Sequence, residues 1–194
     1  MTQKYNVAVA GATGAVGTEI VQILEERNFP IDKLFLLASS KSKGKKVEFR
    51  DQEIVVEDLS EFDFSKAHIG LFSPGGKISA EFAPKAAKAG CIVIDNTSHF
   101  RMQQNIPLIV PEVNANALDD FFDDENRTNI ISNPNCSTIQ MVVALKPLHD
   151  KAIINRVVVS TYQAVSGAGK TGMDELFNQT QNVYANQELK KEKF

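Results

Sequence analysis

The feature that most constrains the fold is a glycine-rich turn between a strand-like segment and a helical segment near the start of the chain. Residues 4–10 (KYNVAVA) are a short valine-rich run, the next seven residues read GATGAVG, and apolar residues then recur at helical spacing to about residue 27. In this order, backbone N–H groups at the helix start can meet phosphate groups. The spacing G-x-x-G-x-x-G is a weak signal alone, but its place after a strand favours a dinucleotide site over a plain tight turn. The candidate ligands are Gly11, Thr13, Gly14, Ala15 and Val16.

The rest of the chain alternates between apolar runs and helical patterns. Further strands are expected at residues 34–38, 47–50, 53–56, 69–72, 91–95 and 129–132, with 47–50 and 53–56 as a small hairpin. Helices are expected at residues 78–89, 137–149 and 170–189, the acidic stretch 118–128 as a surface loop or helix end, and residues 157–165 (VVVSTYQAV) as the longest strand. Strands that are apolar on both faces and alternate with helices predict an α/β fold with a parallel, Rossmann-like sheet.

The composition excludes several classes of partner. With 43% hydrophobic residues, 23% charged residues and a formal net charge of −3, the chain has no dense basic surface for nucleic acid. Its start contains no apolar stretch of the length that a signal peptide or membrane span requires, so we expect no membrane association and a cytoplasmic location. Two cysteines are too few for a disulfide framework, so each is expected to be a thiol.

The loop after the second main strand bears on the choice of dinucleotide. Rossmann-like domains that select NAD usually carry an acidic residue in this loop, and its carboxylate binds the ribose hydroxyls. Here the hydroxyls and the positive charge would accommodate a 2′-phosphate, which a carboxylate would repel. The residues concerned are Ser39, Ser40, Lys41 and Ser42. They predict NADP as the cofactor, whereas Lys45 and Lys46 are about as well explained as part of a solvated basic loop.

The two cysteines lie in different surroundings. Cys91 lies inside an apolar strand pattern, where an inert buried thiol is the expected state. Cys136 lies in the polar run NPNCSTIQ, after a strand and immediately before a helix. A thiol at a helix N-terminus has its thiolate stabilised by the helix dipole and by N–H groups, which can also hold an oxyanion. Cys136 is therefore the expected nucleophile.

Five phrases in order resemble the aspartate-β-semialdehyde dehydrogenase family: GATGAVG at 11–17, DNTSHFR at 95–101, VPEVN at 110–114, NPNCSTIQ at 133–140 and STYQAVSGAG at 160–169. The resemblance implies an NADP-binding Rossmann-like domain over residues 1–132 and the first part of an α+β catalytic and dimerisation domain over residues 133–194. It implies a homodimer that reduces L-aspartyl-4-phosphate to L-aspartate-4-semialdehyde with NADPH and releases phosphate. That reaction feeds the synthesis of lysine (through diaminopimelate), methionine and threonine.

The resemblance also implies roles for individual residues. Cys136 would displace phosphate to form a thioester, which hydride from the nicotinamide would reduce. Gln163 would orient the substrate beside the thiol, and Arg101, assisted by Asn135, would bind the phosphoryl group. The family usually has an arginine where this sequence has Lys41. The lysine keeps the positive charge but lacks the bidentate fork of a guanidinium group. Further cofactor contacts would be Gly75, Ser166 and Gly167, and no metal is implied.

Part of the family's machinery has no counterpart in this sequence. The proton-transferring histidine and the arginine that holds the substrate carboxylate lie further downstream in the family, and the histidines here are His68, His99 and His149. His149 is about 20 Å from Cys136 along the expected helix, and only His99 is near an active-site phrase. We therefore expect a piece of a longer protein that does not turn over efficiently alone. The alternative is a non-catalytic NADP-binding or partner-binding module; the phrases disfavour N-acetyl-glutamyl-phosphate reductase and glyceraldehyde-phosphate dehydrogenase.

Overall fold

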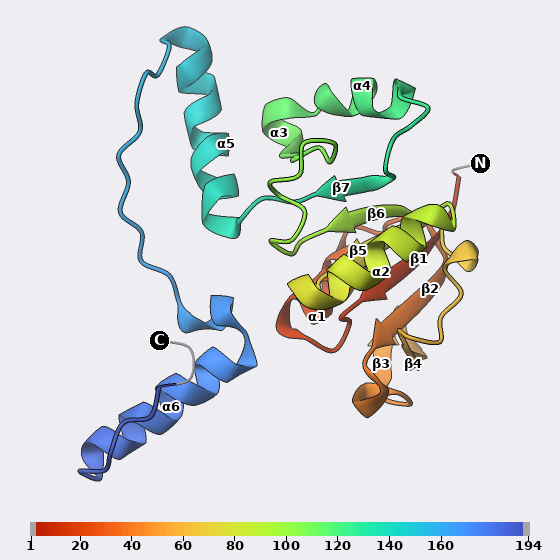
Figure 1. Cartoon of the computed structure of the whole chain (residues 1–194). Helices are drawn as coiled ribbons and strands as arrows, with labels where there is room; N and C mark the ends of the chain where they lie inside the picture. Colours follow the sequence, from red (N-terminus) through yellow and green to blue (C-terminus); the bar gives the residue numbers. More distant parts are fainter. Residues whose placement is uncertain (1–2, 192–194) are drawn as a thin grey trace. The chain divides into compact units, whose positions relative to one another are not determined.

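The computed structural model describes residues 3–191, which form two compact units, one ending at Ile154 and one beginning at Asn155. The first unit is built on a seven-stranded sheet (Figure 1) in the order β3-β4-β2-β1-β5-β6-β7. The neighbouring strands are parallel except for the antiparallel pair β3 and β4. The strands are β1 (Tyr5–Ala10), β2 (Ile31–Ala38), β3 (Lys46–Phe49), β4 (Gln52–Asp58), β5 (Ile69–Phe72), β6 (Ile92–Asp95) and β7 (Ile130–Ser132).

The α-helices and 3-10 turns of the first unit connect or follow its strands. They are α1 (Ala15–Glu26), α2 (Gly76–Lys88), α3 (Pro111–Asn114), α4 (Ala117–Asp123) and α5 (Cys136–Lys151), with the short 3-10 turns η1 (Ser40–Ser42) and η2 (Phe64–Lys66). The second unit contains the 3-10 turn η3 (Val165–Ala168) and the helix α6 (Lys170–Tyr184). None of the helices described within residues 3–191 combines the length and the apolar character needed to cross a bilayer.

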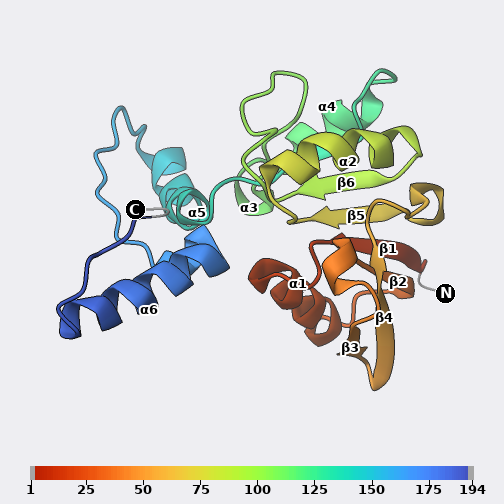
Figure 2. The same ribbon diagram turned by 60° about the horizontal axis from the view of Figure 1, so that its bottom comes forward.

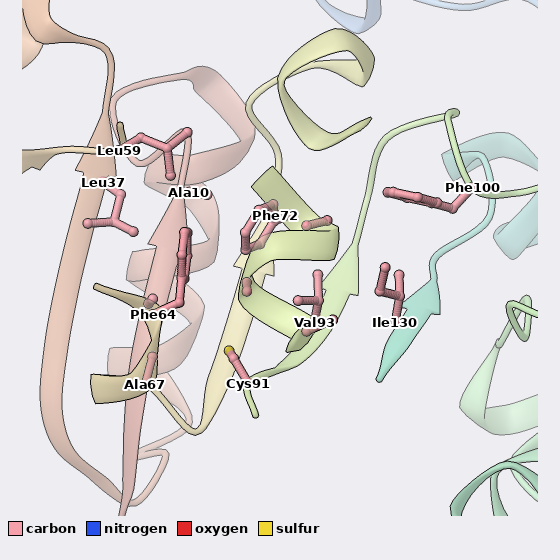
Figure 3. Close-up of a cluster of buried hydrophobic side chains, with 14 of the residues drawn as sticks. Ala10, Leu37, Leu59, Phe64, Ala67, Phe72, Cys91, Val93, Phe100 and Ile130 are labelled. Atoms are coloured by element: carbon pink, nitrogen blue, oxygen red, sulfur yellow. The ribbon is translucent and has the colours of Figure 1, made fainter. Parts of the chain in front are cut away.

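Helices α1 and α2 cover opposite faces of the sheet (Figures 1 and 2). Alternate residues of β1 pack on opposite faces of the sheet. Val7 and Val9 belong to one cluster with Val21 of α1, and Ala8 and Ala10 belong to the other with Ala83 of α2. All of these side chains are at most 4% exposed. Figure 3 shows the cluster on the α2 side. The predicted α/β fold with a parallel sheet buried on both faces is therefore confirmed.

The predicted hairpin is present, and it is also part of the main sheet. Strand β4 pairs antiparallel with β3 on one side, and on the other side it pairs parallel with β2 through Leu36↔Val56 and Ala38↔Asp58. Strand β4 reaches Asp58, two residues beyond the predicted end, and β2 begins at Ile31 instead of residue 34. The carboxyl ends of β2 and β4 therefore lie side by side at one edge of the sheet.

The prediction of a strand at residues 157–165 is wrong. Residues 153–164 have no regular secondary structure, and Val158 and Tyr162 are 84% and 103% exposed. A β-strand is stable only when its N–H and C=O groups pair with a neighbouring strand, and none of the strands in residues 3–191 pairs with this segment. The helix predicted to residue 189 ends earlier, at Tyr184, because Asn186 takes a left-handed conformation (φ 51°) that reverses the chain.

Strand β7 lies at the end of the sheet and is accompanied by a preceding segment of the chain. The backbone N–H of Ser132 donates to the carbonyl of Pro107 at 2.9 Å, and the N–H of Ile109 donates to the carbonyl of Ser132 at 3.0 Å. Leu108 forms a parallel bridge with Ser132. The backbone next to β7 is thus paired by the residues around Leu108, although these are not part of a named strand.

Candidate active site

The turn between β1 and α1 needs glycine at two positions for packing reasons. Gly11 has φ +85°, and a Cβ atom there would lie 2.8 Å from the backbone of Ser73 and 2.9 Å from that of Pro74. A Cβ at Gly17 would lie 2.1 Å from the carbonyl oxygen of Gly11. Both glycines let the start of α1 lie against the turn, where its first N–H groups lack partners within the helix. This arrangement can receive a phosphate or pyrophosphate group.

A pocket of about 480 Å³ opens beside this turn. It lies at the carboxyl ends of β1, β2, β4 and β5, which is where parallel α/β sheets bind their ligands. Its lining residues come from the turn, from the loops after these strands and from α2: Gly11, Thr13, Gly14, Ala38, Ser39, Ser40, Asp58, Leu59, Ser60, Ser73, Pro74, Ile78 and Phe82.

The structure places half of the predicted cofactor residues of the first unit in this pocket. Those that line it are Gly11, Thr13, Gly14, Ser39 and Ser40. Ser42 lies next to it, because the hydroxyl of Thr13 donates to that of Ser42 at 3.4 Å. Ala15 is the first residue of α1, Lys41 is exposed in η1, and Gly75 precedes α2 with φ +94°. Val16 instead lines a separate pocket with Asn96 and Asn133.

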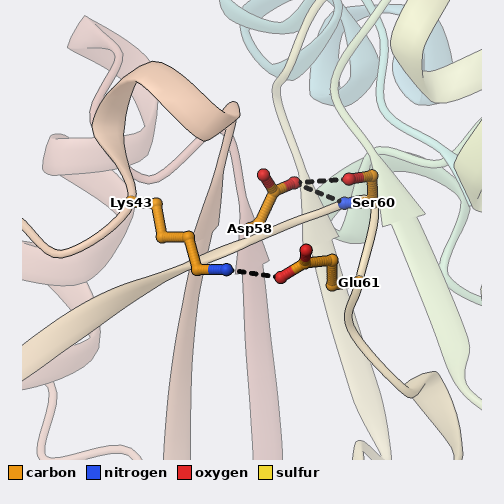
Figure 4. Close-up of polar contacts among 4 residues, drawn as sticks. All are labelled: Lys43, Asp58, Ser60 and Glu61. Carbon is orange, nitrogen blue, oxygen red and sulfur yellow. Dashed lines mark hydrogen bonds and ion pairs between the residues drawn. The ribbon is translucent and has the colours of Figure 1, made fainter.

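The polar residues at the end of β4 were not predicted from the sequence. Oδ1 of Asp58 accepts hydrogen bonds from the backbone N–H of Ser60 at 2.9 Å and from its hydroxyl at 2.6 Å, and nearby Lys43 forms an ion pair with Glu61 (Figure 4). The hydrogen bonds from Ser60 lower the pKa of Asp58 below its usual value, and the bond with Glu61 raises the pKa of Lys43. The parallel pairing of β4 with β2 would have revealed Asp58, because it puts the strand end beside Ser39.

Cys136 is the first residue of α5 and is exposed. Asn135 caps the helix, since its Oδ1 accepts from the N–H of Ser137 at 3.1 Å and from its hydroxyl at 2.5 Å. The cap fixes the entry of the chain into the helix and holds the thiol at the positive end of the helix dipole. The predicted position of the thiol at a helix start is confirmed, and its catalytic role stays a prediction.

Arg101 is held beside the turn that leads to the nucleophile. Its Nε donates to the carbonyl of Asn133 at 3.0 Å, and its Nη2 donates to the carbonyl of Asn96 at 3.0 Å. The two asparagines are joined directly, because Nδ2 of Asn133 donates to Oδ1 of Asn96 at 2.7 Å. The fully buried Asp95 orders the start of this loop by accepting two hydrogen bonds from Thr97. One edge of the guanidinium is therefore fixed to the backbone.

The other titratable groups fit structural roles. Cys91 is fully buried, as predicted, and burial raises the pKa of its thiol to about 12. Nδ1 of His68 accepts from the N–H of Asn6 at 3.0 Å, and Nδ1 of His149 accepts from that of Ile154 at 3.2 Å. His99 is exposed near the start of α2 and packs edge-on against Phe100. Among the described residues, no cluster of three His, Cys, Asp or Glu side chains is arranged to hold a metal ion.

The remaining predicted residues lie together in the second unit. Gln163 is exposed in the extended segment, and Ser166 and Gly167 are in η3. A Cβ atom at Gly167 would lie 2.2 Å from Nε2 of Gln163, so the amide group lies against this glycine. The local arrangement brings the substrate-orienting and cofactor candidates of this unit into one turn.

Comparison with known proteins identifies both parts of the chain. Residues 6–121 match the family described as "Semialdehyde dehydrogenase, NAD binding domain", and residues 145–194 match "Semialdehyde dehydrogenase, dimerisation domain". Aspartate-semialdehyde dehydrogenase 2 of Vibrio cholerae is 58% identical over 180 residues, which are 93% of this chain and 52% of that protein. Aspartate-semialdehyde dehydrogenase of Rickettsia typhi is 51% identical over 194 residues, 100% of this chain and 56% of that protein. The chain thus spans about half the length of these relatives.

Solved structures agree with the sequence matches. Aspartate semialdehyde dehydrogenase II of Vibrio cholerae, complexed with ASA, has a TM-score of 0.91 and 53% identity, covering 100% of this chain and 56% of that one. The Candida albicans enzyme with NADP has a TM-score of 0.64 and 26% identity, covering 78% and 48%. The resemblance found in the five phrases is confirmed, and the chain belongs to the semialdehyde dehydrogenase family.

Proposed function

We propose that this chain provides the cofactor-binding and nucleophilic part of an NADP-dependent aspartate-semialdehyde dehydrogenase. The reaction is the reductive dephosphorylation of L-aspartyl-4-phosphate to L-aspartate-4-semialdehyde, in the route to lysine, methionine and threonine. The observation that carries the proposal is the connection of Cys136, at the start of α5, to Arg101 through the backbone of Asn133. The hydrogen bond holds the proposed phosphate-binding cation, from the loop after β6, against the turn that leads to the proposed nucleophile.

Cys136 attacks the acyl carbon of the substrate. The thiolate forms the S–C bond, and the C–O bond to phosphate breaks, so that phosphate leaves and a thioester remains. The N–H groups at the start of α5, other than that of Ser137, which Asn135 caps, are proposed to stabilise the oxyanion that develops on the carbonyl oxygen. When bound, NADPH supplies the hydride that brings the acyl group to the aldehyde level. Gln163 is proposed to orient the acyl group beside the sulfur.

Arg101 and Asn135 are proposed to bind the phosphoryl group. The Nε side of Arg101 is occupied by backbone carbonyls, so the phosphate is met by the Nη1 and Nη2 end of the fork. The oxygen of Asn135 is occupied as the helix cap, so this residue contributes its Nδ2 group as donor. Both groups donate, which suits the acceptor oxygens of a phosphate.

The pocket at the glycine turn fits a dinucleotide. Its glycines leave room where a Cβ would collide with the backbone, and the hydroxyls of Ser39 and Ser40 line its rim. Together with Ser42 and the exposed Lys41, these groups are suited to a 2′-phosphate and support NADP over NAD. Ala15, Val16 and Gly75 would contribute backbone, and Ser166 and Gly167 would complete the cofactor site. The structure of the Candida albicans relative contains NADP.

Two further properties are proposed for the complete protein. The match of residues 145–194 to a dimerisation domain supports a homodimer. A nucleophilic Cys136 needs a reducing compartment, which supports a cytoplasmic location. The substrate is the phosphorylated amino acid, and nucleic acid and membrane are not proposed as partners.

The proposal can be tested on the 194-residue chain as it stands. NADPH titrated into the protein should give saturable fluorescence enhancement, and incubation with L-aspartyl-4-phosphate should add one acyl group at Cys136, detected by peptide mass spectrometry. Cys136→Ser should lose the thioester, and Cys91→Ala is the matched control that should keep it. Steady-state NADPH oxidation should be slow, because the sequence lacks the family's downstream histidine.

The outcomes separate the proposal from its alternative. Acylation of Cys136 with NADPH binding supports the dehydrogenase mechanism. Saturable NADPH binding without acylation would favour a non-catalytic NADP-binding module. Normal acylation of the Cys136→Ser variant would exclude this residue as the nucleophile.

A further inference from the structure

The pocket beside the glycine turn has an end suited to a flat aromatic base. If the phosphates lie at Gly11–Gly14 and the substituted ribose lies at Ser39 and Ser40, the base lies further along, among the residues contributed by β4 and α2. The apolar surfaces there come from Leu59, which is 5% exposed, and from Ile78 and Phe82. These side chains can cover the faces of a ring but make no hydrogen bonds with its edge.

Asp58 supplies the polar group at this end. It is 8% exposed, lines the pocket and is the register partner of Ala38, the residue that precedes Ser39. Both hydrogen bonds from Ser60 reach the same carboxylate oxygen, Oδ1 (Figure 4). No donor within residues 3–191 forms a hydrogen bond with Oδ2, which leaves this oxygen for a ligand.

The carboxylate keeps its negative charge. The hydrogen bonds from Ser60 lower the pKa of Asp58, and Lys43, whose charge also lowers it, is engaged in the ion pair with Glu61. An ionised carboxylate accepts hydrogen bonds and cannot donate them. It therefore attracts a ring amino group and repels a ring carbonyl oxygen at the same place.

We infer that Asp58 selects adenine as the base of the bound dinucleotide by accepting a hydrogen bond from the exocyclic amino group. The inference rests on the proposed NADP-binding function and adds a specificity-determining residue to it. A purely structural role is the competing explanation, because Asp63 closes the same kind of turn with Ser65, at 3.1 and 2.7 Å. Asp63 does not line the pocket, so the two aspartates form a matched pair for a test.

The experiment compares NADP with deamino-NADP, in which hypoxanthine replaces adenine and a carbonyl oxygen replaces the amino group. Dissociation constants are measured by isothermal titration calorimetry on the 194-residue chain. The wild type should bind NADP about tenfold or more tightly than deamino-NADP, as one good base-edge contact provides. In Asp58→Asn, the amide oxygen can remain with Ser60 and the NH₂ group can face the base, so the ratio should fall to about one or reverse. Asp63→Asn should keep the wild-type ratio.

The results distinguish the inference from the function on which it rests. Equal binding of the two dinucleotides by the wild type, or an unchanged ratio in Asp58→Asn, would overturn the role of Asp58 while leaving NADP binding intact. Failure of the wild type to bind either dinucleotide would contradict the proposed cofactor and the inference with it. If Asp58→Asn does not fold, as judged by circular dichroism, the wild-type comparison alone decides.

Discussion

Replacing Gly17 with alanine should destabilise the first unit, although alanine is the better helix former. The new Cβ would lie 2.1 Å from the oxygen of Gly11 and 2.8 Å from Cα of Ala12, whereas real Cβ contacts essentially never fall below 3.0 Å. The obstructing atoms are backbone, so no side-chain rotation relieves the clash and the start of α1 must move away from the turn. Such overpacking costs about 1–3 kcal/mol. Helix propensity returns about 0.5–1 kcal/mol, so a net loss of about 1 kcal/mol is expected.

The loss should appear as a lower urea midpoint in far-UV circular dichroism with an unchanged slope. NADPH binding should weaken too, because the same movement displaces the helix N-terminus from the phosphate site. Gly76→Ala is the control. Gly76 is the first residue of α2, and the atom nearest to a Cβ added there is Cβ of His99, at 3.9 Å. The free energy of unfolding of this variant should stay within about 0.5 kcal/mol of the wild-type value. A Gly17→Ala protein as stable as the wild type would refute the argument.

Three further outcomes are expected. In the native protein iodoacetamide should alkylate Cys136 and spare the fully buried Cys91 until denaturant is added, and equal labelling by mass spectrometry would contradict the burial. Because burial raises the pKa of Cys91 to about 12, the unfolded state loses this proton first, and the free energy of unfolding should fall between about pH 9 and 12, by up to about 1.4 kcal/mol per pH unit. Cys91→Ala should remove that slope, and an unchanged slope would assign it to other groups. Lys41→Arg should tighten NADPH relative to NADH about threefold, since the guanidinium can bind a phosphate through two hydrogen bonds, and an unaltered ratio would place the 2′-phosphate elsewhere.

The parts that follow from local pattern were predictable. The valine-rich β1, the glycine turn and α1 are adjacent in the sequence, and the position of Cys136 follows from its place between a strand and a helix. The fully buried Cys91 was also expected, because its neighbours are apolar. In each of these cases the prediction used only the residues next to the feature in the sequence.

The parts that depend on distant pairing were not predictable. Residues 53–56 were interpreted as one half of a hairpin, and nothing in their alternation indicated the parallel pairing with β2 that brings Asp58 to the pocket. The apolar run 157–165 has strand composition but no strand partner within the described chain. The anchoring of Arg101 to Asn133 joins residues 32 positions apart and likewise cannot be inferred from spacing.

The pairing of the backbone around Leu108 with β7 has a consequence for aggregation. An exposed sheet edge offers a row of unsatisfied N–H and C=O groups on which a second molecule can add a strand. At one end this protein covers the edge with its own chain, and at the other β3 is four residues long and carries the charged Lys46 and Glu48. Edge-to-edge pairing between two molecules is thereby disfavoured at both ends of the sheet. The protein can therefore reach a high concentration without aggregating through this sheet.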